Sequence, residues 1–128
     1  MRKHSNWIIT ILAAIVLMAV AMAAPVSAHH GWSEYQDEQF EITGTLATPV
    51  SLAGPHGTTQ IRVDEDLWDV VLAPSTRTAD AGLTEDVIPV GATVTASGHR
   101  HLDEATLEIK TERLTWNGKV FDVYPERN

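Results

Sequence analysis

The chain has 128 residues, with 17 acidic side chains against nine lysines and arginines and a formal net charge of −8 at pH 7. It contains no cysteine, which excludes disulfides, a cysteine nucleophile and thiolate metal ligands. An acidic surface repels phosphate groups, so the composition disfavours nucleic acid as a partner and predicts an attraction for cations.

The first 28 residues have the features of an export signal. Arg2 and Lys3 form a basic start, an apolar run follows over residues 8–24, and the triplet 26–28 supplies the −3 and −1 positions of a cleavage site. We therefore expect residues 1–28 to be a signal peptide and the mature protein to be periplasmic or secreted by a bacterium. The alternative is an uncleaved anchor, because the apolar run is close to the shortest that crosses a bilayer.

Cleavage after Ala28 would place a histidine pair at the start of the mature chain. The new α-amine and Nδ1 of His29 can close a chelate ring, and His30 adds an amide and an imidazole nitrogen. His56, between a proline and a glycine in an expected loop tip, offers a further ligand. Nitrogen and carboxylate donors suit Cu(II) or Zn(II). Cleavage after Ser27 would instead make His30 the third residue, an arrangement that Cu(II) and Ni(II) favour.

After a mature N-terminal segment at 29–38, residues 39–128 are expected to form one domain. Apolar and polar residues alternate there in short runs, as in half-buried strands. Gly44, at the centre of the first run, indicates a strand that bends sharply. The expected strands are 40–46, 59–63, 67–72, 93–98, 107–116 and 120–124.

The connections define the expected fold. Residues 64–66 predict a tight acidic hairpin, and 117–118 (Asn-Gly) predict a two-residue hairpin turn. Residues 75–89 lack alternation, and we expect Thr84 to cap a short helix there that Pro89 ends. The order of three strands, a short helix and two or three strands predicts a small five- to six-stranded barrel of the oligonucleotide/oligosaccharide-binding (OB) type. A small sandwich is the alternative.

Several short motifs, in this order and spacing, resemble a group of small exported bacterial proteins classed as a domain of unknown function. They cover essentially the whole mature chain: His29-His30-Gly31-Trp32, Pro55-His56-Gly57, the run 68–75, Arg77 and Gly82-Leu83. The pair Ser75-Thr76 departs from the Pro-Ser pair expected before the arginine. The resemblance implies a periplasmic, barrel-like domain and carries no activity. In size and class the chain also looks like periplasmic copper-carrier barrels, but its mature part lacks the methionine of their site.

Four further residues are candidates for ligand or partner contacts. Trp32 follows the histidine pair and is expected either to anchor the N-terminus onto the barrel or to close one barrel end. Arg77 follows a strand end and is suited to bind a carboxylate, although a salt bridge within the chain is the simpler interpretation. His99 and His101 flank the end of a strand and alternation points both to one face, where chance surface histidines are the simpler interpretation.

No motif for an enzyme is found: the sequence has no G-x-S-x-G elbow, no H-E-x-x-H helix and no phosphate-binding glycine loop. Two functional hypotheses follow. In the first, the protein binds Cu(II) or Zn(II) through His29, His30 and His56. In the second, it is a metal-independent barrel that holds a small molecule, a glycan or a protein partner.

Overall fold

The computed structural model describes residues 31–127, so the expected signal peptide and the pair His29-His30 lie outside the described residues. The described part is all-β with one short α-helix, as the sequence predicts. Its strands are β1 (Phe40–Leu46), β2 (His56–Val63), β3 (Asp66–Pro74), β4 (Thr93–Arg100), β5 (Glu108–Trp116) and β6 (Lys119–Asp122). Helix α2 (Ser75–Asp80) follows β3, and a 3-10 turn, η1 (Pro125–Arg127), follows β6.

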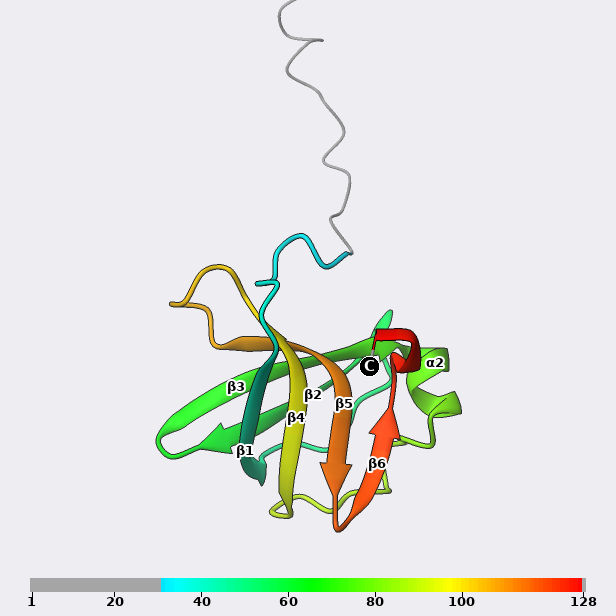
Figure 1. Ribbon diagram of the computed structural model, residues 1–128. Helices are drawn as coiled ribbons and strands as arrows, with labels where there is room; N and C mark the ends of the chain where they lie inside the picture. Colours follow the sequence, from blue (N-terminus) through cyan, green and yellow to red (C-terminus); the bar gives the residue numbers. More distant parts are fainter. Residues whose placement is uncertain (1–30, 128) are drawn as a thin grey trace, which may run out of the picture. The chain divides into compact units, whose positions relative to one another are not determined.

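Five of the strands close into a barrel (Figure 1). Antiparallel pairing gives the order β3-β2-β1-β4-β5-β6, and a parallel pairing of β3 with β5 completes the ring by placing Val70 beside Ile109. Strand β6 extends β5 outside the ring. A closed five-stranded barrel with its helix between the third and fourth strands is compatible with the OB fold.

Gly44, where the sequence predicts a bend, lies next to the point at which β1 begins to pair with a second strand. Strand β1 pairs with β4 from Phe40 to Thr45 but with β2 only at Thr45 and Leu46. A Cβ on Gly44 would lie 2.1 Å from the carbonyl oxygen of Arg62. Only glycine therefore lets the two strands approach this closely.

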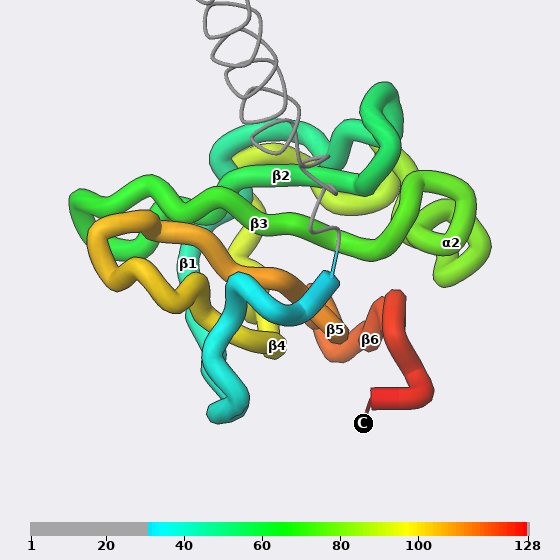
Figure 2. The backbone as a smooth tube through the Cα atoms, turned by 90° about the horizontal axis from the view of Figure 1, so that it is seen from above, coloured from blue at the N-terminus to red at the C-terminus, as the bar shows by residue number. Residues whose placement is uncertain are grey.

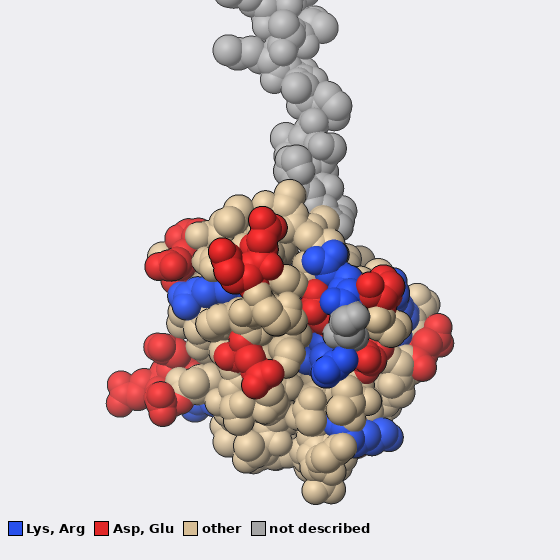
Figure 3. Space-filling view, in the orientation of Figure 1, with Lys and Arg blue, Asp and Glu red and all other residues tan. Residues whose placement is uncertain are grey.

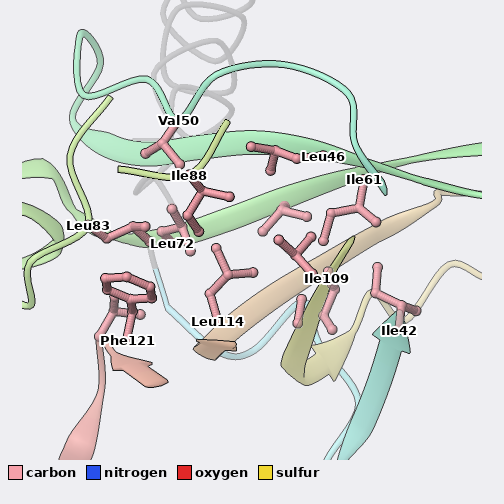
Figure 4. Packing of buried hydrophobic residues seen from close by; sticks show 14 of the residues in the cluster. Ile42, Leu46, Val50, Ile61, Leu72, Leu83, Ile88, Ile109, Leu114 and Phe121 are labelled. Atoms are coloured by element: carbon pink, nitrogen blue, oxygen red, sulfur yellow. The ribbon is translucent and has the colours of Figure 1, made fainter. Parts of the chain in front are cut away.

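The barrel interior is a continuous apolar core. Residues from all six strands and from the segment between α2 and β4 point toward one another, as Figure 4 shows. Leu83 and Ile88, from that segment, close one end of the core against Phe121 of β6. Trp68 is buried as the sequence predicts, and Trp116 packs against the core.

The helix lies earlier in the chain than predicted. It begins at Ser75, because Pro74 restricts the preceding backbone and Thr78 is buried with its hydroxyl donating to the carbonyl of Ala73. Gly82, with φ of 88°, ends it. The expected cap at Thr84 is wrong: the chain forms turns there, because the following apolar residues are used to cover the core.

Residues 31–38, which we call the N-terminal strap, run across the outside of the barrel before β1. In Figure 2 the strap (cyan) crosses β5 and β4. Tyr35 forms an isolated bridge with His101, the amide of Gln36 donates to the carbonyl of Arg100 at 2.8 Å, and Leu102 donates to Glu34 at 2.8 Å. The strap is thus hydrogen-bonded to the end of β4.

Candidate functional site

A groove of about 670 Å³ crosses the outer wall of the barrel over β2 and β3. One side is the loop between β1 and β2, which lies close to β2 because Ser51 and Thr58 exchange two backbone hydrogen bonds of 2.8 and 3.0 Å. The start of β5 and Glu85, from the segment after α2, complete it. In OB barrels this wall and its bordering loops form the usual binding surface.

The lining of the groove combines apolar side chains, Val71 among them, with hydroxyl and carboxylate groups. Hydroxyl groups come from residues such as Thr48, Ser51 and Thr58, and carboxylates come from Asp69, Glu85 and Glu108; no lysine or arginine lines it. Asp69 and Glu108 are register partners on the parallel strands β3 and β5. The groove therefore repels anions and can form many hydrogen bonds with a neutral or positively charged ligand.

Neutral donors orient the carboxylates of the groove. The amide of Gln60 donates to Asp69 at 2.9 Å, and the hydroxyl of Tyr35 donates to Glu108. Burial, followed by the hydrogen bond to Glu108, raises the pKa of Tyr35, so the hydroxyl stays protonated at neutral pH. Tyr35 belongs to the N-terminal strap, so Glu108 belongs to both the groove wall and the contact with the strap.

Trp32 anchors the strap to the barrel, as one of the two expectations for this residue states. Its ring packs edge-on against His99 and Tyr124, with centroids 5.5 and 5.1 Å apart. The guanidinium of Arg127 lies 3.8 Å from its centroid and the ammonium of Lys110 lies 4.9 Å away, both within cation–π range. Trp32 thus joins the start of the described chain to its end.

Beneath the strap, His99 and Glu112 form a buried hydrogen-bonded pair. Nε2 of His99 lies 2.8 Å from Oε1 of Glu112, and Nδ1 lies 2.9 Å from the carbonyl oxygen of Gln36. Arg127 and Gln39 also donate to Glu112, each at 2.9 Å. Burial alone would raise the pKa of Glu112, but these hydrogen bonds outweigh it and hold the pKa below its ordinary value.

Lys110 is buried as well, with 4% of its surface exposed. Its Nζ donates to the carbonyl of Gly31 at 3.3 Å and lies near the rings of Trp32 and Tyr35. Burial lowers the pKa of Lys110, and the neighbouring charge of Arg127 lowers it further. The sequence holds a signal for this cluster that the prediction missed: Glu108, Lys110 and Glu112 alternate along one strand, and alternate residues of a strand lie on one face.

The other predicted site residues lie apart from the groove or serve the fold. Arg77 forms an exposed ion pair with Glu126 and lies over the ring of Tyr124, which agrees with the salt-bridge interpretation. His99 lies within β4 and is buried, so its interpretation as a chance surface residue is wrong. The bulge in the pairing of β4 with β5 brings it against the strap.

The two other histidines of the described range have different surroundings. His101 packs against Tyr35, with centroids 5.6 Å apart, and its Nδ1 accepts from the amide of Asp103 at 3.0 Å. His56 begins β2 opposite Pro74, and is part of the strand instead of the expected loop tip. The pairing of β2 with β3 continues past a bulge between His56 and Thr58, and it therefore includes His56.

Charge is unevenly distributed on the surface. On the face shown in Figure 3, acidic side chains are widely spread, whereas most basic ones gather near the C-terminal end. Residues 31–127 contain no group of three or more histidine, aspartate or glutamate side chains arranged to hold a metal ion. Within the same range no helix is long and apolar enough to cross a membrane.

The fold and groove define a small closed β-barrel of OB-like architecture with an acidic groove on its wall. No protein-family model matches the chain, and no curated protein matches it either. The barrel architecture expected from the sequence is thus present, and the resemblance to a particular exported family stays a prediction.

Proposed function

We propose that this protein is an exported binding module whose groove over β2 and β3 holds a small polar ligand that is neutral or positively charged. The observation that carries the proposal is the groove itself, which lies on the wall that OB barrels use for saccharides and oligonucleotides. Its carboxylates and the acidic surface argue against an oligonucleotide or any other anion.

Chemical-shift mapping by NMR on the mature protein tests this proposal with three probes: maltose as a neutral ligand, spermidine as a cation and citrate as an anion. We expect maltose or spermidine to shift the amide signals of groove residues such as Thr58 and Gln60 in a saturable way. Citrate should leave them unchanged. Shifts confined to other surfaces, or saturable binding of citrate in the groove, would contradict the proposal.

A matched pair of variants locates the binding. Val71→Trp places a large ring in the groove, whereas Val120→Trp places the same ring on β6, where Val120 is 49% exposed. We expect the first variant to lose at least tenfold in affinity and the second to bind as the unaltered protein does. Equal affinity of both variants would place the ligand elsewhere.

Metal binding is a second proposal, favoured by the anchoring of Trp32. Because Trp32 is held by Lys110 and Arg127, the chain is fixed to the barrel two residues after His30. The proposed ligands are the mature α-amine, His29 and His30, with His56 as a further donor, and the proposed ions are Cu(II) or Zn(II).

Calorimetric titration of the protein beginning at His29 with CuCl2 or ZnCl2 tests the metal proposal. We expect one tightly bound ion and a loss of at least a hundredfold in affinity when His29 and His30 are both replaced by alanine. His56→Ala measures the third donor, and His101→Ala serves as the control. Undiminished affinity in the double variant would refute the proposal.

A further inference from the structure

Both ring nitrogens of His99 face hydrogen-bond acceptors. The partner of Nδ1 is the backbone carbonyl of Gln36, which can only accept, and the partner of Nε2 is the carboxylate of Glu112. Arg127 and Gln39 donate to that carboxylate, which favours its ionised form. A neutral imidazole has one N–H group, so both hydrogen bonds are made only when the imidazole carries two protons.

We infer that His99 is a proton-operated latch: its protonated ring ties the N-terminal strap to the barrel, and loss of one proton loosens the strap. The inference is independent of the proposed groove ligand. It assigns to His99 a switching role, because the ring links two separate parts of the chain, the carbonyl of Gln36 in the strap and the carboxylate of Glu112 in β5.

Deprotonation leaves an unfavourable contact in either tautomer. With the proton on Nδ1, the lone pair of Nε2 faces the Glu112 carboxylate at 2.8 Å; with the proton on Nε2, the lone pair of Nδ1 faces the Gln36 carbonyl at 2.9 Å. The site is too buried for water to relieve this contact in place, since 7% of His99 and 1% of Glu112 is exposed. Moving the strap outward admits water and removes the conflict.

The charged groups around His99 come from three elements. Glu112 and Lys110 lie on β5, Arg127 is in η1, and the strap contributes the rings of Trp32 and Tyr35. Glu112 favours the protonated imidazole, and the positive charges of Arg127 and Lys110 oppose it.

Lys110 responds to pH in the opposite sense. Burial lowers its pKa, so losing its proton favours the state in which the strap covers it. The two residues therefore act in opposite directions: the two hydrogen bonds of His99 require its extra proton, whereas the lowered pKa of Lys110 favours attachment of the strap as pH rises.

The experiment follows His99 and the strap together from about pH 5 to about pH 8, the range in which histidines ordinarily titrate. Long-range 1H–15N NMR spectra of the mature protein report the protonation of each imidazole nitrogen. The amide of Gln36 in the strap donates to the carbonyl of Arg100, and the amide of Leu102 donates to the carbonyl of Glu34 in the strap. Hydrogen exchange at these two amides therefore reports whether the strap is attached. Amides of the core strand β5, such as that of Leu114, give the global reference.

We expect a doubly protonated His99 at acidic pH. Once the ring has lost its proton, the protection factor of the strap amides, which is the intrinsic exchange rate at each pH divided by the measured rate, should fall at least tenfold, whereas that of the core amide should stay unchanged. His99→Gln, which keeps a polar side chain but cannot titrate, should have low protection factors at the strap amides at all pH values. His101→Gln, at the other histidine in contact with the strap, should keep the pH dependence. Lys110→Met should keep it too, which assigns the change to His99.

Two outcomes would overturn the inference. One is a singly protonated His99 while the strap amides remain protected. The other is the same pH dependence of the strap protection factors in His99→Gln as in the unaltered protein. Because exchange is compared with the core amide of the same molecule, a variant that merely lowers global stability is recognised by faster exchange in the core as well.

Discussion

Gly98 lies against the backbone of Lys110 so closely that a Cβ on the glycine would be 2.0 Å from the carbonyl oxygen of the lysine. The contact coincides with a bulge: Ser97 pairs with Arg113 and Gly98 with Thr111, so Glu112 is left as the extra residue of β5. Bulges re-aim side chains. At this bulge the carbonyl of Glu112 accepts from the amides of Val123 and Tyr124, which follow β6, and its side chain is directed to His99.

Gly98→Ala is expected to destabilise the protein by about 3 kcal/mol or more, because backbone atoms of two strands would have to separate. Chemical denaturation followed by tryptophan fluorescence measures the change. Gly54→Ala is the control, since the nearest atom to its Cβ would be 3.7 Å away; we expect it to change stability by less than about 0.5 kcal/mol. Equal effects would mean that the bulge tolerates a side chain.

Glu112→Gln is expected to cost about 3 kcal/mol, because it leaves the buried donor of His99 and the partly exposed guanidinium of Arg127 without their anionic partner. The matched control is Glu126→Gln, which breaks the exposed ion pair with Arg77 and should cost less than about 1 kcal/mol. Urea titration at neutral pH compares them. A similar small loss in both would show that the buried carboxylate contributes no more than a surface one.

The free energy of unfolding is expected to decrease as pH is lowered in the acid range. The pKa of Glu112 is held below its ordinary value, so its contribution is present above about pH 4.3, where the unfolded carboxyl ionises, and is lost as pH falls through the lower pKa of the folded state. Urea titrations between pH 6 and pH 2 should therefore give a flatter profile for Glu112→Gln. Parallel profiles for the two proteins would show that other carboxyl groups cause the loss of stability at low pH.

Trp32→Ala is expected to destabilise the protein by about 2 kcal/mol through loss of its ring contacts with Tyr124 and His99 and of two cation–π contacts. Trp32→Phe should recover part of this loss, because a smaller ring remains. Leu102→Ala, at a side chain that is 57% exposed, is the control and should be nearly neutral. If thermal denaturation shows no difference between Trp32→Ala and this control, the strap is not anchored by the ring.

The alternation of apolar and polar residues predicted most strand positions. The expected strand 40–46 has those bounds in the structure, and the Asn117-Gly118 turn has φ of 51° and 74°, the positive values that its residue types favour. These features depend on local chemistry. The helix was misplaced because its position depends on which residues, Leu83 and Ile88 among them, are needed to cover the core.

The candidate sites were harder to predict, because they join residues that are distant in the chain. Alternation placed His99 and His101 on one face, but it could not show that the strap covers this face. The groove likewise combines a loop after β1 with the start of β5. Contacts of this kind follow from barrel closure, which depends on the pairing of β3 with β5.

The sequence by itself determined an acidic, cysteine-free domain of alternating strands, because composition and period-two patterning act over a few residues at a time. Only the tertiary structure decided that Glu112 contacts His99 and Arg127. It also decided that the ring of Trp32 packs against both His99 and Arg127. The physical reason is that burying a charge depends on its partners, and three segments far apart in the chain supply them once the barrel has closed.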